Sequence, residues 1–286
     1  MSDINNNHNA RCAPTKTFSD GSCIPLRLLV EMAKCYNNET TNINKIKLNS
    51  NRETLSPQKY KKYLVGEFEK RLGTICDDQK CWVKQDFMKQ MNSSIREELT
   101  KNTFRFKGPQ GNATWLDTNN INNALMQYEY KYHDFKFLGA VPIDFDDLPS
   151  YNIKNLNYKK LMDNGMTKLG IVFNLDEHDK PGSHWTAMFA DLLKGNVFYF
   201  DSYGIEPEQR IINLMKRTGK FIQNTFKKRP KIDYNKTRHQ FGNSACGVYS
   251  ISFITRMLRD GDFNKVTREV VKDDEINKCR KIYFTK

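Results

Sequence analysis

The sequence predicts a protein of two parts, a helical amino-terminal arm over residues 1–98 and a domain over residues 99–286 that mixes helices and strands. Two observations support this division. Apolar residues recur at helical spacing in the first part, whereas from Thr103 onward strand-like and helix-like segments alternate between Gly, Pro and Asn residues. With 286 residues, the chain is long enough for one well-buried core and a smaller appendage.

Two helices are expected in the arm, over residues 25–36 and 58–72, because each range places its apolar residues on one side. The Asn-, Thr- and Lys-rich stretch 37–52 between them is typical of a loop or linker. Four residues separate Cys76 from Cys81, as in half of a zinc site, but no second pair and no nearby His completes it. Neither a metal nor another cofactor is therefore expected.

Five segments of the second domain have the composition and length of strands. They cover residues 135–141, 168–175, 186–191, 197–200 and 231–238. Gly195 lies between the third and the fourth of them, in the short turn that an antiparallel hairpin requires. The outer ends of these two strands are therefore expected to lie together.

Three longer helices are expected beside these strands. Thr118 or Asn119 is placed to cap the first, which has about three turns. The second covers residues 206–227, where apolar residues recur largely at intervals of three and four. The third covers residues 246–258 and is apolar nearly all round, which is typical of a helix in the core.

The chain is basic, with 46 Lys and Arg against 33 Asp and Glu and a formal net charge of +13. Such an excess attracts nucleic acid or an acidic partner, but a solvated basic surface explains it equally well. The densest cluster lies at the expected end of the second helix, where the helix dipole favours cations without any ligand. This cluster consists of Lys227, Lys228, Arg229 and Lys231.

No apolar run approaches the ~18 residues of a membrane span, so none is expected. The start of the chain, residues 1–9, is polar and Asn-rich and does not resemble a secretory signal. Seven cysteines are an odd number, which argues against a disulfide scaffold in a chain of this kind. Reduced thiols in a cytosol-like compartment are expected instead.

Cys246 opens the core helix directly after the turn-prone residues 242–244. At the amino end of a helix, a thiol meets unpaired backbone N–H groups and the positive end of the helix dipole. With a His beside it, the pKa of such a thiol can fall from ~8.5 to roughly 3.5–7.5. A lone cysteine is more often a small core hydrophobe. The neighbours expected around Cys246 favour a nucleophile instead.

Thiol catalysis also needs a base, a group that fixes this base, and donors for the oxyanion. His184 and Asp201 stand at the adjoining ends of the hairpin strands, so the carboxylate can hold one imidazole nitrogen and leave the other facing the thiol. Gln240, six residues before Cys246, can present its amide beside the Cys246 backbone N–H. Alone, each would be interpreted as structural: a core His, a turn-forming Asp and a loop Gln. Together they predict a cysteine protease.

The order and spacing of these residues resemble the proteases that cleave ubiquitin-like modifiers and the related adenovirus protease. The residues that carry this resemblance are His184, Trp185, Asp201, Gln240, Cys246 and Gly247. Within this superfamily, segments 182–189 and 238–247 are most similar to the virion-maturation proteases of large cytoplasmic DNA viruses, such as the African swine fever virus polyprotein protease. The resemblance is strong over residues 168–258, weaker over 103–167 and faint before that.

This resemblance implies an α+β, papain-like core, in which a mixed central sheet is flanked by helices and the nucleophile lies at a helix amino end. It implies cleavage after Gly-Gly in a viral core polyprotein, without a cofactor, in the virion and the host cytoplasm. Trp185 would roof a narrow substrate tunnel, although packing on the core explains an aromatic residue there equally well. The African swine fever enzyme has Asn in the third triad position, where this chain has Asp201.

Two other functions fit parts of the sequence. A protease that removes SUMO- or ubiquitin-like modifiers would use the same triad and the same Gly-Gly tunnel. A catalytically inactive structural or DNA-binding virion protein on the same fold is favoured only by the basic charge. All four catalytic positions are filled, which argues against this inactive protein.

Overall fold

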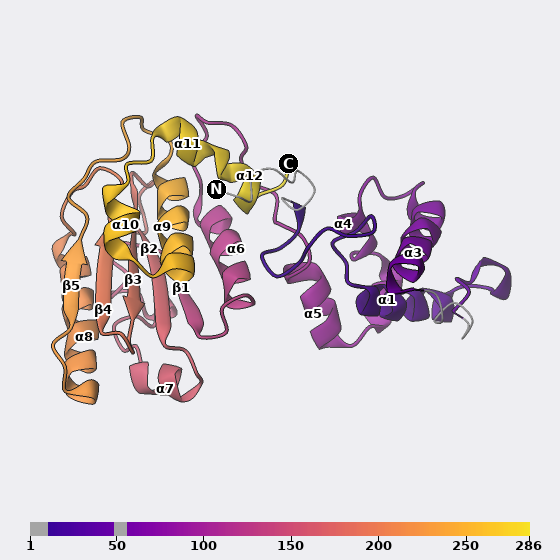
Figure 1. The fold of residues 1–286 in the computed structure, drawn as a ribbon, viewed down its shortest axis with the longest axis horizontal. Coiled ribbons are helices and arrows are strands. Elements are labelled where there is room, and N and C mark those ends of the chain that lie inside the picture. The colour runs from indigo at the N-terminus through magenta and orange to yellow at the C-terminus, as the bar shows by residue number, and fades with distance from the viewer. Residues whose placement is uncertain (1–10, 49–55) are drawn as a thin grey trace. The chain divides into compact units, whose positions relative to one another are not determined.

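A computed structural model describes residues 11–48 and 56–286 (Figure 1). The polar start of the chain, residues 1–9, and the end of the predicted loop, residues 49–52, lie outside the described residues. The chain divides into two compact units, the first ending at Arg105 and the second beginning at Phe106. The boundary predicted after residue 98 falls inside helix α5.

The first unit is helical, as predicted. Its helices are α1 (Leu26–Glu39), α3 (Pro57–Leu72), α4 (Gln79–Trp82) and α5 (Ser93–Lys101), with 3-10 turns η2 (Asn42–Asn44) and η3 (Asp86–Gln90). Ser56 caps α3, and Pro57 occupies its first position, where the missing N–H costs nothing. The unit has its own apolar core, in which the Phe68 and Trp82 rings stack 5.6 Å apart.

The cysteines of this unit correct one expectation. The structure contains two disulfides, Cys12–Cys23 and Cys76–Cys81, so the prediction of reduced thiols is wrong for these four residues. In both pairs the Cα atoms lie 5.4 Å apart, within the usual range for a disulfide, because local turns bring the partners together. Cys76 and Cys81 bind one another and are not half of a metal site. The free cysteines of the described chain are Cys35, Cys246 and Cys279.

The second unit is built on a five-stranded mixed sheet, and all five predicted strands are confirmed. The strands, in spatial order, are β1 (Phe135–Pro142), β2 (Lys168–Asn174), β3 (Trp185–Asp191), β4 (Asn196–Phe200) and β5 (Lys231–Tyr234). The outer pairs β1–β2 and β4–β5 are parallel, and the inner pairs are antiparallel. The predicted hairpin is β3–β4, with Gly195 at a positive φ of 78° in its turn.

Helices cover both faces of this sheet. One apolar core joins a sheet face to α6 (Thr118–Glu129) and α9 (Cys246–Asp260), and the other joins the opposite face to α8 (Gln209–Phe226). The short helix α7 (Tyr158–Asp163) packs with α8. Alternate residues of β3 and β4 enter the two cores, as the period of a strand requires.

Two helix boundaries differ in detail from the prediction. The cap of α6 is Asp117, not Thr118 or Asn119: its carboxylate accepts the Asn120 N–H at 2.7 Å, and the Asn120 side chain accepts the Asp117 N–H at 3.2 Å. This reciprocal pair satisfies two N–H groups at once. Helix α8 covers Gln209–Phe226 instead of the predicted 206–227. Lys227, Lys228 and Arg229 of the basic cluster follow its carboxyl end as expected, whereas Lys231 begins β5.

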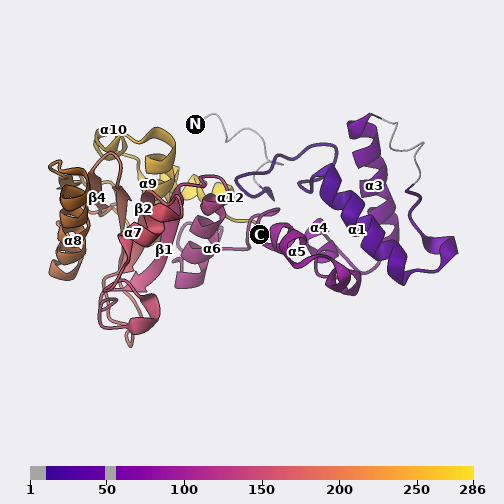
Figure 2. The same ribbon diagram turned by 90° about the horizontal axis from the view of Figure 1, so that it is seen from below.

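Three short helices follow α9 and were not predicted. They are α10 (Phe263–Arg268), α11 (Asp273–Lys278) and α12 (Arg280–Tyr283), drawn in yellow in Figure 1. Helix α10 packs beside α9 in both ribbon views (Figure 2), and α11 also contacts α9. None of the helices in the described ranges is both long and apolar enough to span a membrane.

Candidate active site

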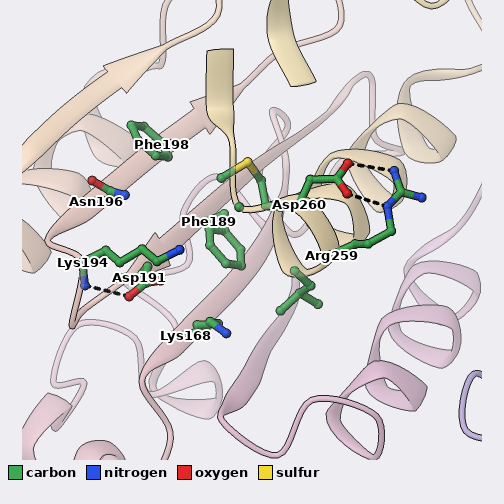
Figure 3. Close-up of a pocket in the computed structure, with 11 residues that line it drawn as sticks. Lys168, Phe189, Asp191, Lys194, Asn196, Phe198, Arg259 and Asp260 are labelled. Carbon is green, nitrogen blue, oxygen red and sulfur yellow. Dashed lines mark hydrogen bonds and ion pairs between the residues drawn. The ribbon is translucent and has the colours of Figure 1, made fainter. Parts of the chain in front are cut away.

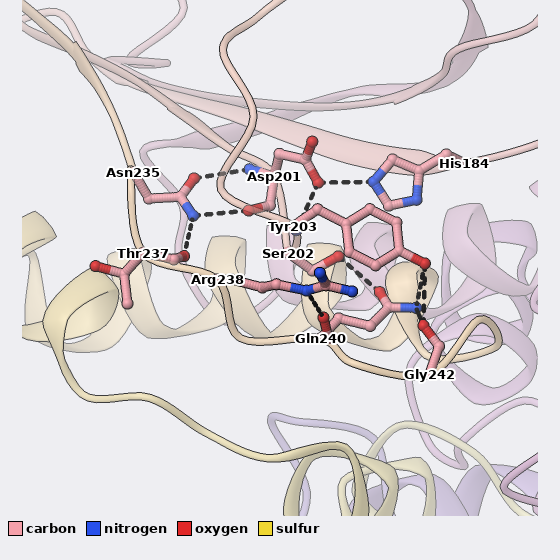
Figure 4. A network of polar contacts seen from close by, with 9 residues as sticks. All are labelled: His184, Asp201, Ser202, Tyr203, Asn235, Thr237, Arg238, Gln240 and Gly242. Atoms are coloured by element: carbon pink, nitrogen blue, oxygen red, sulfur yellow. Dashed lines mark hydrogen bonds and ion pairs between the residues drawn. The ribbon is translucent and has the colours of Figure 1, made fainter.

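The hairpin brings His184 and Asp201 together. His184 directly precedes β3 and Asp201 directly follows β4, and the pairing of Ala187 with Phe200 sets these two ends side by side. The ring Nε2 of His184 lies 2.7 Å from Oδ1 of Asp201 (Figure 4). The carboxylate is almost fully buried, so little water competes for this hydrogen bond.

The neighbouring strand holds Asp201 in place. Asn235 follows β5, and its side chain accepts the Asp201 N–H at 2.8 Å and donates to the Asp201 carbonyl at 2.7 Å. The Tyr203 N–H donates to Asp201 Oδ1 at 2.9 Å. Strand β5 ends at Tyr234, four residues earlier than predicted, because Asn235 turns to these contacts. Sequence reasoning missed Asn235, although parallel pairing of β4 and β5 would have placed it at the end of β4.

Cys246 is the first residue of α9 and is buried. Ala245 is the N-cap and no side chain caps this end, so the first N–H groups of the helix lack a side-chain acceptor. With Nε2 on Asp201, the free nitrogen of the His184 ring is Nδ1. Burial alone would lower the pKa of His184, but hydrogen bonds with Asp201 and Cys246 and their negative charges raise it from 6.5 to about 9.

Aromatic rings flank the imidazole. The Tyr203 ring stacks on His184 with centroids 4.7 Å apart. The Arg238 guanidinium lies 5.2 Å from the Tyr203 ring and 4.9 Å from the Phe241 ring, which is 67% exposed. Tyr203 thus covers one face of the His184 ring, and Arg238 and Phe241 continue the stack beyond Tyr203.

Gln240 lies in the loop before Cys246 and is fully buried. Its Oε1 accepts the Ser202 hydroxyl at 2.7 Å, and its Nε2 donates to the Gly242 carbonyl at 2.9 Å and to the Tyr203 hydroxyl at 3.4 Å (Figure 4). The amide predicted to serve the oxyanion is thus engaged with Gly242 of its own loop and with Ser202 and Tyr203 after β4.

Asp273 at the start of α11 fixes the same loop from outside. Its Oδ2 accepts the backbone N–H groups of Phe241 at 2.9 Å and Gly242 at 2.7 Å, and its Oδ1 accepts the Tyr249 hydroxyl at 3.1 Å. No motif in the sequence marks Asp273, because two of its partners are backbone groups about thirty residues away and the third is the Tyr249 hydroxyl, 24 residues away.

Known proteins identify the family of this site. The sequence model of the Ulp1 protease family, C-terminal catalytic domain, matches residues 166–286. Protein R355 of Acanthamoeba polyphaga mimivirus, named as a thiol protease, is 37% identical over 282 residues, which are 96% of this chain and 92% of that protein. The chain belongs to the Ulp1 protease family. It is a cysteine protease, so the predicted enzyme class is confirmed.

The relatives of this Ulp1-family protease include other viral proteins. A cysteine protease of African swine fever virus (isolate Tick/Malawi/Lil 20-1/1983) is 24% identical over 254 residues, 82% of this chain and 92% of the relative. A crystal structure of the African swine fever virus protease has a TM-score of 0.64 and 22% identity and covers 79% of this chain and 90% of that one. This likeness confirms the predicted α+β fold with a mixed sheet.

Trp185 of the protease is 5% exposed and lies in the core. Its indole Nε1 donates to the Leu116 carbonyl at 2.8 Å. The Leu116 side chain lies 3.0 Å from the point where a Cβ on Gly247 would be, so Gly247 allows this close contact. Trp115, which precedes Leu116, is 45% exposed.

The cavity drawn in Figure 3 is separate from this site. It has a volume of about 210 Å³ and lies where β3 ends and α9 ends, whereas His184 precedes β3 and Cys246 begins α9. Two of its cations, Lys168 and Arg259, are paired with Asp134 and Asp260 at 2.8 Å. Across residues 11–48 and 56–286, no group of three or more His, Cys, Asp or Glu is arranged to hold a metal ion.

Proposed function

We propose that Cys246 is the nucleophile of this protease, His184 its base and acid, and Asp201 the residue that orients the imidazole. The observation that carries this assignment is the 2.7 Å contact between His184 and Asp201, beside a cysteine at the uncapped amino end of a buried helix. Among the other free cysteines of the described residues, Cys35 lies in the arm and Cys279 follows α11, and neither has a His–Asp pair in contact.

The reaction follows from these positions. The Cys246 thiolate attacks the scissile carbonyl while the proton it gave up stays on His184. Collapse of the tetrahedral adduct transfers this proton to the leaving amine and leaves a thioester on Cys246. Water then attacks the thioester, with its proton taken by His184, and restores the thiol and the free carboxyl product. A His184 pKa of about 9 keeps the imidazolium available as the acid at neutral pH.

The oxyanion would be held by the backbone N–H of Cys246 and the amide of Gln240. Because the Gln240 Nε2 now donates to the Gly242 carbonyl at 2.9 Å, substrate binding has to turn or share this donor. Tyr203, whose hydroxyl donates to the same carbonyl at 3.0 Å, can satisfy Gly242 when Gln240 leaves it. The Gly242 carbonyl would therefore keep a hydrogen-bond donor, the Tyr203 hydroxyl, when Gln240 turns to the substrate.

For the substrate, we infer an extended chain cleaved after Gly-Gly in a viral core polyprotein, in the virion and the host cytoplasm. The exposed Trp115 stands between Thr114, which Arg280 links to the turn before Cys246, and Leu116, which contacts the helix at Gly247. A bulky ring there favours substrate residues without side chains. The family model begins at residue 166, whereas the matches to the two viral proteins cover more of the chain than residues 106–286. The arm is thus a feature shared with viral relatives.

Incubation of the protein with the core polyprotein of its own virus, followed by sequencing of the new amino termini, tests this substrate. We expect termini that begin directly after Gly-Gly, and none with the Cys246→Ser variant. New termini after other residues, produced by the wild type alone, would reject the Gly-Gly specificity while leaving the nucleophile in place.

The second candidate substrate is a conjugate of a SUMO-like modifier. One observation favours it: some of the related African swine fever virus proteins are named as SUMO-1 cysteine proteases. The comparison is kcat/KM on a Gly-Gly peptide from the core polyprotein against a SUMO or ubiquitin fusion. We expect a higher kcat/KM on the peptide. A higher kcat/KM on the fusion, which is lost when the folded modifier is replaced by its tail peptide, would favour deconjugation.

A further inference from the structure

Arg280, the first residue of α12, is the largest fully buried side chain of the described structure. It is 0% exposed. A guanidinium ion is effectively always protonated, and an isolated buried charge is costly unless other groups compensate it. The groups around Arg280 must therefore compensate its buried charge.

The partners of Arg280 are neutral oxygens. Its Nε donates to Asn277 Oδ1 at 2.7 Å, and its Nη2 donates to the carbonyls of Thr114 at 2.7 Å and Ser244 at 3.2 Å. A longer contact of 3.5 Å joins Nη1 to the Pro109 carbonyl. Within the described residues, no carboxylate forms an ion pair with Arg280.

These contacts join the two segments that flank the thiol. Ser244 stands two residues before Cys246, and its hydroxyl also donates to the Asn112 carbonyl at 2.6 Å. Thr114 stands next to the exposed Trp115 and two residues before Leu116, which contacts the helix at Gly247. One guanidinium thus fixes the segment 109–116 against the turn that presents Cys246.

We propose that Arg280 is a positioning residue for Cys246, which sets the turn before the nucleophile and supplies a buried positive charge that favours its thiolate. This inference rests on the proposed role of Cys246. Burial lowers the pKa of Arg280, and the negative charge of Cys246 opposes this effect. The two groups are therefore close enough to interact electrostatically.

The test is the pH dependence of Cys246 alkylation by iodoacetamide in the full-length protein, followed by peptide mass spectrometry so that Cys35 and Cys279 are read separately. Arg280→Met removes the charge at similar length, and Lys281→Met removes an exposed neighbouring charge as the matched control. We expect alkylation of Arg280→Met at about pH 6 to be about tenfold slower than that of the control, because this variant loses both the buried positive charge and the contacts that fix the turn before the thiol.

A second variant separates charge from geometry. Arg280→Lys keeps the charge but cannot reach several carbonyls with one rigid fork, so its alkylation profile should match the control while kcat falls about tenfold. If Arg280→Met does not fold, the lysine variant decides alone, because a shifted profile or an unchanged kcat contradicts the proposal. Equal profiles for Arg280→Met and Lys281→Met would overturn it as well. Failure of the Cys246 assignment is recognised separately, by activity that survives Cys246→Ser.

Discussion

Asn235 holds both backbone groups of Asp201, accepting its N–H and donating to its carbonyl from the end of the neighbouring parallel strand. A Cys–His–Asp site needs its carboxylate at one fixed place, and Asn235 provides this through the main chain. The carboxylate itself stays free for His184 and the Tyr203 N–H.

Removal of this support should impair catalysis without touching the triad. Asn235→Ala leaves two buried backbone groups unsatisfied, which costs about 1–3 kcal/mol of stability for each such group. We expect a lower kcat with Cys246 still open to alkylation. The measurement is kcat and thermal melting beside Asn224→Ala, an exposed control on α8. Equal kcat in both variants would contradict a role of Asn235 in placing Asp201.

The pKa of His184 predicts the alkaline limb of activity. Since this pKa is raised from 6.5 to about 9, the imidazolium persists through neutral pH, and kcat/KM should fall as the pH rises through about 9. The stability that the charged His184 contributes is likewise complete below about 6.5 and lost through about 9. Asp201→Asn removes a cause of the raised pKa, so its limb should move to lower pH. An unmoved limb in the profile of kcat/KM against pH would contradict this cause.

Asp201 and Gln240 should differ in importance. Gln240→Ala removes the proposed oxyanion donor, and the loss of such a donor is on the order of 10² to 10³ in kcat. Asp201→Asn keeps a hydrogen bond to His184 without the charge, so we expect the smaller loss. Steady-state kinetics at one neutral pH make the comparison. The opposite order would mean that the charge of Asp201 matters more than the Gln240 donor.

Gly247 should not tolerate a side chain. In Gly247→Ala the new Cβ would lie 3.0 Å from Leu116, so the segment that carries Trp115 must shift and kcat/KM on Gly-Gly peptides should fall. Gly66→Ala is the matched control, since nothing lies within 4 Å of its Cβ and alanine favours the helix by roughly 0.5–1 kcal/mol. Thermal melting should show destabilisation at Gly247 and stabilisation at Gly66. A Gly247→Ala variant as active and stable as the wild type would mean that Leu116 can move away from the new Cβ without loss of stability or activity.

The arm is expected to serve substrate recognition and not chemistry. A truncated protein beginning at Phe106, where the second unit begins, should keep its reactive Cys246 but cleave the core polyprotein poorly. Alkylation and polyprotein cleavage are measured on the same sample. If the truncated protein keeps its Cys246 reactivity and cleaves the core polyprotein as well as the full chain does, the arm has a function other than substrate recognition.

The sequence was sufficient for the sheet and for the contact between His184 and Asp201, because a short hairpin fixes which residues meet at its ends. It was insufficient for Asn235, Asp273 and Arg280. These side chains bind backbone groups of segments that are distant in sequence. Any residue type can supply a backbone group, so the sequence does not show where such a partner lies. The arm disulfides were missed for a related reason: cysteine number indicates a compartment, whereas pairing depends on which turns bring two Cα atoms together.

The central claim, that Cys246 is the thiol that attacks after Gly-Gly, is tested most directly by labelling the intact protein with an electrophilic peptide probe ending in Gly-Gly. The labelled residue is identified by peptide mass spectrometry. We predict a single adduct on Cys246, abolished in Cys246→Ser and slowed in Gln240→Ala. Label concentrated on Cys35, Cys279 or the cysteines of the arm disulfides, with Cys246 unmodified, would contradict this account.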